Sequence, residues 1–182
     1  MFNEIILNSF FVLYFKNIKK IEIYVDSLDF QKEEIINFSS EFIFGYNLKS
    51  YTFDIYKTLD NKSSKKSIIC KIISIHKEQI NKKYKYNEAI KSGVFLTRDL
   101  VSEPGNILHP DEYVKRLIKL KKYGLKVTVY DEKKLKKLGC NALIGVGQGS
   151  IRGSYLVTIE WNGNKSKSKP LAFVGKGVCF DT

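Results

Sequence analysis

The chain has few of the side chains on which most metal and nucleophilic sites depend. Its 182 residues include only two histidines, His76 and His109, which excludes an HExxH zinc site and argues against a Ser-His-Asp or Cys-His triad. His76 follows a predicted strand and His109 precedes a proline, so we interpret both as structural or surface residues. The three cysteines form no CxxC pair, a pattern typical of a reduced, intracellular protein. They are Cys70, Cys140 and Cys179.

Arginine is also scarce, although the chain is strongly basic. The 31 Lys and Arg residues against 19 Asp and Glu residues give a net charge of +12. Only Arg98, Arg116 and Arg152 are arginines, which leaves 31 − 3 = 28 lysines. Proteins that bind bases or phosphates in a bidentate manner favour arginine. The composition therefore argues against nucleic-acid recognition, while the net charge still attracts polyanions nonspecifically.

A long apolar run is absent as well. The most apolar stretch, Ile5–Phe15, has 11 residues, whereas a membrane-spanning helix needs about 20. It follows Glu4 instead of a basic region, and no small-residue cleavage site comes after it. We predict a buried strand or helix here, no membrane association and a cytoplasmic location. Hydrophobic residues at 43% suffice for the core of one domain or of pieces of two.

Strand and helix patterns alternate along the rest of the chain. Apolar runs and alternating apolar positions predict strands at 21–25, 67–75, 125–130, 154–161 and 171–174. Apolar residues spaced by threes and fours, with capping residues at the ends, predict helices at 29–45, 82–101, 110–123 and 131–138. Strands that alternate with helices predict an α/β fold with parallel pairing.

Two glycine-containing stretches are candidates for a functional site. Gly145–Ser150 (GVGQGS) lacks the last glycine of GxGxxG and the lysine of a Walker motif, so we interpret it as a turn. Val174–Thr182 (VGKGVCFDT) places Lys176 between glycines after an apolar strand, with Asp181 five residues later. Open α/β sheets bind ligands at the carboxyl ends of their strands, and the glycines must bend the chain if the two side chains are to meet. From the spacing alone, an ordinary ion pair in a loop is the simpler interpretation.

A resemblance to a known family changes that interpretation. Val174–Thr182 resembles the signature strand and loop of the leucyl aminopeptidases, a cytosolic family of dinuclear metallopeptidases. Three more stretches agree in the same order, and the match covers about residues 20–182. These stretches are Tyr51–Thr58 (YTFDIYKT), Thr97–Pro110 (TRDLVSEPGNILHP) and Gly145–Ser150.

The resemblance implies a role for each residue of the pair. In the family, the lysine of this motif coordinates one metal ion and the aspartate bridges both, which assigns these roles to Lys176 and Asp181. An amine coordinates a metal only when deprotonated, and a carboxylate can offer one oxygen to each of two cations. The implied cofactors are two divalent ions, manganese or zinc, with magnesium also compatible. The implied reaction releases N-terminal amino acids from peptide substrates, and family members are hexamers.

The resemblance also implies a domain organisation. We expect a partial N-terminal α/β domain at 1–78, a connecting helix and linker at 79–108, and the beginning of the metallopeptidase catalytic domain at 109–182. The family's F-D-T motif continues into a glycine pair, a second lysine, further acidic ligands and an arginine, all beyond Thr182. We therefore expect an incomplete catalytic domain that contains no catalytic residue, is inactive alone and binds metal only weakly. The alternative is a noncatalytic remnant or subunit that binds the missing C-terminal half, a homologous subunit or a polyanion.

Overall fold

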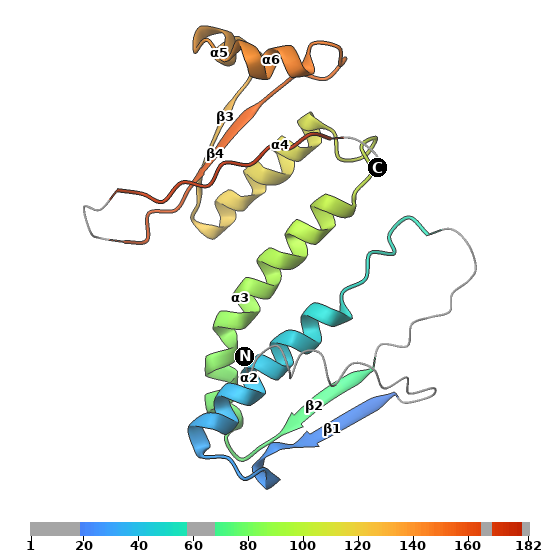
Figure 1. Cartoon of the computed structure of the whole chain (residues 1–182), viewed down its shortest axis with the longest axis vertical. Coiled ribbons are helices and arrows are strands. Elements are labelled where there is room, and N and C mark those ends of the chain that lie inside the picture. Colours follow the sequence, from blue (N-terminus) through green and yellow to red (C-terminus); the bar gives the residue numbers. More distant parts are fainter. Residues whose placement is uncertain (1–18, 58–67, 165–168, 180–182) are drawn as a thin grey trace. The chain divides into compact units, whose positions relative to one another are not determined.

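The computed structural model describes residues 19–57, 68–164 and 169–179. The predicted element at Ile5–Phe15 and the predicted site residue Asp181 lie outside these ranges. The chain divides into two compact units, Met1–Ser102 and Glu103–Thr182 (Figure 1). Within the described ranges, no helix combines the length and the apolar character that crossing a membrane requires.

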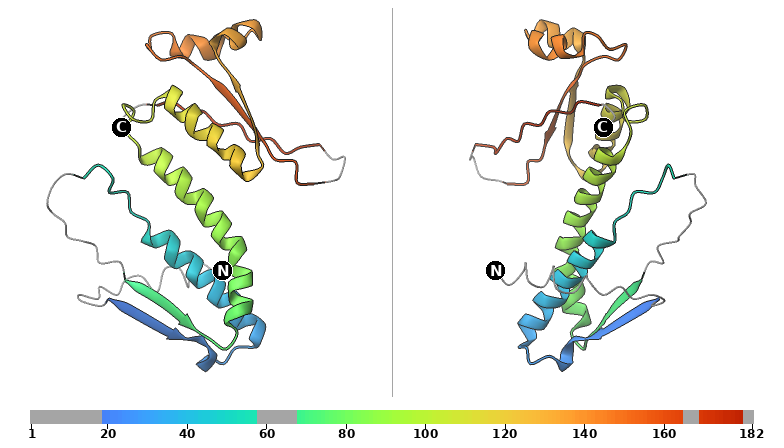
Figure 2. Two further views of the ribbon diagram at one scale, coloured as in Figure 1. Left: turned by 180° about the vertical axis from the view of Figure 1, so that it is seen from behind. Right: turned by 45° about the vertical axis from the view of Figure 1, so that its right-hand side comes forward.

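The first unit contains two parallel strands and two long helices (Figures 1 and 2). Strands β1 and β2 pair in parallel, with Ile21 opposite Cys70 and Ile23 opposite Ile72. The helices α2 and α3 pack against each other, and the Asn87 Nδ2 atom donates hydrogen bonds to Ser40 Oγ at 3.1 Å and Glu41 Oε1 at 3.0 Å between them. The elements are β1 (Lys20–Tyr24), the 3-10 turn η1 (Val25–Ser27), α2 (Lys32–Ser50), β2 (Ile69–Ile73) and α3 (Lys77–Ser102).

Helix α2 begins and ends later than predicted, because its N-cap is Gln31 and the predicted start at residue 29 lies before it. Its start is a capping box, in which the Gln31 side chain accepts from the Glu34 backbone and Glu34 Oε2 accepts from the Gln31 N–H at 2.8 Å. The predicted end at Gly45 is wrong, because the helix continues through this buried glycine to Ser50. Beyond it, Asn47 Nδ2 donates to the Tyr84 hydroxyl of α3 at 2.9 Å, a tertiary contact that offsets the weak helix propensity of glycine.

The second unit contains an antiparallel strand pair and three short helices (Figure 1). Its buried apolar side chains are Leu108, Val127 and Leu135. The elements are α4 (Pro110–Ile118), the 3-10 turn η2 (Lys119–Tyr123), β3 (Lys126–Tyr130), α5 (Glu132–Lys137), α6 (Asn141–Gly147) and β4 (Leu156–Glu160). Gly124 and Gly139 follow η2 and α5 with φ values of 81° and 72°, so both glycines end helical segments in the left-handed conformation.

The pairing in this unit corrects the expectation of parallel strands throughout. Strands β3 and β4 run antiparallel, and the last residue of β3, Tyr130, lies opposite the first residue of β4, Leu156. Helices α5 and α6 therefore return the chain at the same end of the pair instead of crossing to the other end. The α/β class is confirmed, with parallel pairing in the first unit and antiparallel pairing in the second.

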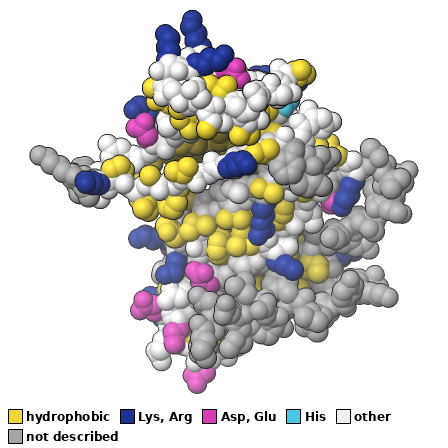
Figure 3. Space-filling view, turned by 45° about the horizontal axis from the view of Figure 1, so that its top comes forward, with side chains coloured by type: hydrophobic (Ala, Val, Ile, Leu, Met, Phe, Trp, Pro, Cys, Tyr) yellow, Lys and Arg dark blue, Asp and Glu magenta, His cyan; other side chains and the backbone are white. Residues whose placement is uncertain are grey.

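The predicted strand at 171–174 is also wrong. These residues form no strand, and the exposed fractions of Leu171, Phe173 and Val174 are 81%, 89% and 99%. The sequence pattern is that of a strand, but a strand is stable only when its N–H and C=O groups pair with a neighbour. Within the described ranges, this segment is hydrogen-bonded to no strand of either sheet. Apolar side chains are visibly open on the face drawn in Figure 3.

Candidate functional site

Lys176, the described member of the predicted metal-binding pair, lies on an exposed segment. Residues 169–179 form neither helix nor strand, and the Lys176 side chain is open to solvent. The described ranges contain no group of three or more His, Cys, Asp and Glu side chains that could hold a metal ion. The proximity of Lys176 and Asp181 therefore stays a prediction.

The two glycines that flank Lys176 have different surroundings. A Cβ atom built on Gly175 would meet nothing within 4 Å. A Cβ atom on Gly177 would lie 3.2 Å from Tyr113 Cε1 and 3.8 Å from Tyr113 Cδ1. The segment that carries the lysine thus approaches helix α4 closely at Gly177, where a larger residue would press on the tyrosine ring.

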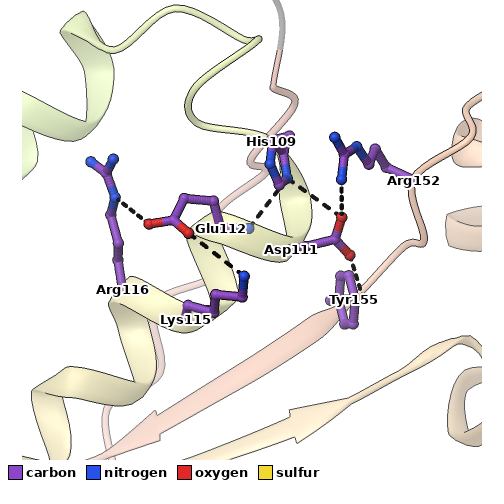
Figure 4. Close-up of polar contacts among 7 residues, drawn as sticks. All are labelled: His109, Asp111, Glu112, Lys115, Arg116, Arg152 and Tyr155. Carbon is purple, nitrogen blue, oxygen red and sulfur yellow. Dashed lines mark hydrogen bonds and ion pairs between the residues drawn. The ribbon is translucent and has the colours of Figure 1, made fainter.

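A polar cluster joins the first turn of α4 to the segment before β4 (Figure 4). The Tyr155 hydroxyl donates to Asp111 Oδ1 at 2.7 Å, and Arg152 Nη1 donates to Asp111 Oδ2 at 3.2 Å. His109 is the N-cap of α4, and its Nδ1 atom accepts a hydrogen bond from the Glu112 N–H at 3.3 Å. The same Nδ1 atom lies 3.4 Å from Asp111 Oδ2.

These contacts shift the pKa values of Asp111 and Tyr155. The hydrogen bond from Tyr155 and then the contacts with Arg152 hold the pKa of the Asp111 carboxyl below its ordinary value. The same hydrogen bond to Asp111, with some desolvation, raises the pKa of the Tyr155 hydroxyl. Both shifts favour the ionised aspartate and the neutral tyrosine, which is the arrangement that the bond requires.

A second set of ion pairs lies further along α4. Arg116 Nη1 donates to Glu103 Oε1 at 2.9 Å, and Arg116 Nε donates to Glu112 Oε1 at 3.2 Å. The Glu103 side chain is 6% exposed, so this carboxylate needs a cation beside it. Its hydrogen bond raises the pKa of the Arg116 guanidinium. The two sets of contacts together fix both the start and the middle of α4 in the second unit.

The chemistry of this cluster is structural. Both oxygens of Asp111 have hydrogen-bond donors, and His109 caps a helix, as the interpretation of His109 as a structural residue expects. Sequence reasoning missed Arg152 and Tyr155 as partners of Asp111, because they are 41 and 44 residues away and no local pattern connects them.

The Gly145–Ser150 stretch begins as the end of a helix and continues as a turn. Gly145 and Gly147 belong to α6, and only the residues after Gly147 form the turn that was predicted. A Cβ atom on Gly147 would overlap Ser154 Oγ, so this glycine allows the end of α6 to approach the segment before β4. The Ser154 N–H donates to Glu132 Oε1 at 3.1 Å, which holds that segment near the start of α5.

Comparisons with known proteins identify what the chain is similar to. The sequence model of the cytosol aminopeptidase family, catalytic domain, matches residues 95–182. The "Probable cytosol aminopeptidase" of Agrobacterium fabrum is 43% identical over 173 residues, which are 93% of this chain and 34% of that protein. The protein of the same name from Phytoplasma mali is 45% identical over 170 residues, 90% of this chain and 33% of that protein. This chain therefore spans about a third of the length of the curated relatives it matches.

Solved structures support the same fold. The bottromycin maturation enzyme BotP has a TM-score of 0.59 with this chain and is 21% identical, over 79% of this chain and 30% of that chain. A second structure of BotP, in complex with Mn, gives the same values. At this level of identity the likeness concerns the fold alone.

Proposed function

Because the chain belongs to the cytosol aminopeptidase family, we propose that it forms part of a metal-dependent aminopeptidase that releases N-terminal amino acids from peptides. The observation that carries the proposal is the identity of 43% over 93% of this chain to a relative named for that activity. The name of the relatives also supports a cytoplasmic location. A hexameric assembly is the oligomeric state that the family resemblance favours.

Lys176 and Asp181 are the residues that we propose as metal ligands. Their nitrogen and oxygen donors suit two divalent ions, manganese or zinc, which when bound would activate water and polarise the scissile carbonyl. The described residues do not complete a ligand set around Lys176. We therefore propose that this chain contributes ligands to a site that further residues complete, and we assign no catalytic step to the chain by itself.

A noncatalytic role as a binding subunit is the second candidate. The observation that favours it is the exposure of Leu171, Phe173 and Val174, at 81%, 89% and 99%. Consecutive exposed apolar residues on an unpaired segment are typical of a surface that another chain covers. The partner that fits is the C-terminal portion of an aminopeptidase, and a homologous subunit or a polyanion are the other occupants.

Complementation separates the two candidates. The full chain would be purified alone and together with the C-terminal portion of the Phytoplasma mali relative that it does not cover. We expect no leucine release from a chromogenic leucine amide with manganese when the chain is alone. Release should appear with the C-terminal portion and disappear in Lys176→Met and Asp181→Asn, because grouped catalytic residues act together. A complex that forms without activity would favour the binding subunit, and activity of the chain alone would contradict the proposed incomplete site.

Metal titration gives a second test. We expect calorimetry of the chain alone with manganese or zinc to show no saturable site of submicromolar affinity, because two ligands are only part of a set. A submicromolar site that disappears in Asp181→Asn would show that the chain completes the site itself.

A further inference from the structure

We propose that Tyr113 is a positioning residue for Lys176, with its ring packed against Gly177 so that helix α4 fixes the segment that carries the lysine. The positioning role rests on the metal-binding function proposed above for Lys176. The contact between Tyr113 and Gly177 is a feature of the fold and does not depend on that function.

The contact is specific to one of the two glycines beside the lysine. Gly177 approaches the ring so closely that an added Cβ would stand 3.2 Å from Cε1, whereas Gly175 has open space. Neither glycine has the left-handed φ that Gly124 and Gly139 have, so backbone strain does not require glycine at either position. At Gly177, glycine is favoured because a larger side chain would press on the Tyr113 ring.

The exposure of the segment changes beside this contact. Val174, before the lysine, is 99% exposed, whereas Val178, after it, is 48% exposed and Cys179 is half-buried. The exposure of the segment therefore begins to fall after Gly177, the residue that approaches the Tyr113 ring. Lys176 directly precedes Gly177, the residue that contacts the Tyr113 ring, and the Lys176 side chain is exposed to solvent.

Helix α4 is a fixed support for the ring. The Tyr113 N–H donates to the His109 carbonyl at 2.9 Å in the first turn of the helix, next to Pro110. Asp111 is bound by Arg152 and Tyr155, and Arg116 is bound by Glu103. Lysine has a long side chain with large rotamer entropy, so a ligand of this type gains from a backbone held in place before the metal arrives. Tyr113 supplies that restraint without touching the metal.

The first experiment tests the contact on the full chain without metal. Nuclear magnetic resonance should show cross-relaxation between the Tyr113 ring protons and the Gly177 α protons, and a ring-current shift of those α protons. Both signals should remain in Tyr113→Phe, because the contact uses ring carbons, and vanish in Tyr113→Ser. A Gly177 spectrum that is the same in Tyr113→Ser and in the unchanged chain would overturn the proposal.

The second experiment tests positioning in the complex of this chain with the C-terminal portion of the Phytoplasma mali relative, because the chain alone does not complete the site, and it uses Mn²⁺ as the probe. Line broadening near Lys176 reports the affinity, and Lys176→Met defines the signal that depends on the lysine. We expect Tyr113→Ser and Gly177→Ala to weaken this affinity about tenfold, as loss of an outer partner of a metal ligand does. Tyr113→Phe and the matched control Gly175→Ala should leave it unchanged.

The outcomes separate this inference from the proposed function. Broadening that depends on Lys176 but not on Tyr113, or equal effects of Gly175→Ala and Gly177→Ala, would overturn the positioning role and leave the metal role standing. Broadening that does not depend on Lys176 would overturn the metal role, and the positioning role with it.

Discussion

The Tyr155 hydroxyl donates a hydrogen bond to Asp111 Oδ1 over 2.7 Å, and this bond ties the residue before β4 to the first turn of α4. Arg152 binds the other oxygen of the same carboxylate, so two residues from one segment hold one side chain of the helix. The helix held in this way is the one that carries Tyr113. The placement that we propose for Lys176 therefore involves residues far from it in the sequence.

Removing the Tyr155 hydroxyl should destabilise the second unit in a way that depends on pH. We expect Tyr155→Phe to lower the free energy of unfolding by about 1 kcal/mol at pH 7, the usual contribution of one such hydrogen bond. The pKa of Asp111 is depressed in the folded chain, so its contribution is present above the ordinary aspartate pKa of about 3.9 and is lost as the pH falls through the folded value. Urea unfolding at pH 7 and at about pH 3 measures both values.

The exposed Tyr123 provides the control for this variant. Tyr123→Phe removes a hydroxyl from a residue that is largely open to solvent, so its effect should be small at either pH. An equal loss of stability in the two variants, or a loss in Tyr155→Phe that does not shrink in acid, would show that the carboxylate does not carry the effect.

The two glycines of α6 should respond differently to alanine. Alanine is the better helix former by about 1 kcal/mol, and Gly145 has open space around it, so Gly145→Ala should stabilise the second unit. Gly147→Ala should stabilise it less or destabilise it, because the new methyl group meets Ser154 Oγ and the hydroxyl must move. Thermal unfolding of the two variants in parallel tests the difference, and a larger gain from Gly147→Ala would refute the close approach of α6 to Ser154.

Backbone amides at 172–174 should exchange with solvent much faster than those of β2. The β2 residues are paired with β1, and the Ile69 N–H donates to the Lys19 carbonyl at 2.9 Å, whereas the apolar segment near Phe173 has neither a strand partner in the described ranges nor burial. Exchange requires opening of hydrogen-bonded structure, so protection reports that pairing. Hydrogen exchange read by mass spectrometry compares the two segments in one sample. Similar protection in both would contradict the exposed placement of 171–174.

The helix and strand positions that follow from local chemistry were predictable from the sequence. Asp131 caps α5 by accepting from the Lys134 N–H at 2.9 Å, and Gly139 ends the same helix with a φ of 72°. The end of α2 was not predictable, because the bond from Asn47 to Tyr84 joins residues 37 positions apart and overrides the stop signal at Gly45.

The candidate site was also predictable only in part from the sequence. The VGKGVCFDT motif pointed to Lys176 and Asp181 through its resemblance to the signature of the leucyl aminopeptidases, whereas the spacing alone favoured an ordinary ion pair. The role of Gly177 was not visible there, because both neighbours of Lys176 are glycines and the sequence does not distinguish them. Only the structure shows that Gly177 lies close to the ring of Tyr113, 64 positions earlier, where a larger residue would press on the ring.

The sequence by itself determined the family and the α/β class, because these depend on residue types, periodicity and motifs within short segments. The two proposed ligands follow from the resemblance to that family and stay a prediction. The tertiary structure alone decided that β3 and β4 pair antiparallel, that 171–174 lies open and that Asp111 binds Arg152 and Tyr155. The physical reason is that pairing and burial are properties of two segments at once. A strand pattern in the sequence predicts which backbone N–H and C=O groups need a partner, but only the folded chain decides which segment pairs with them.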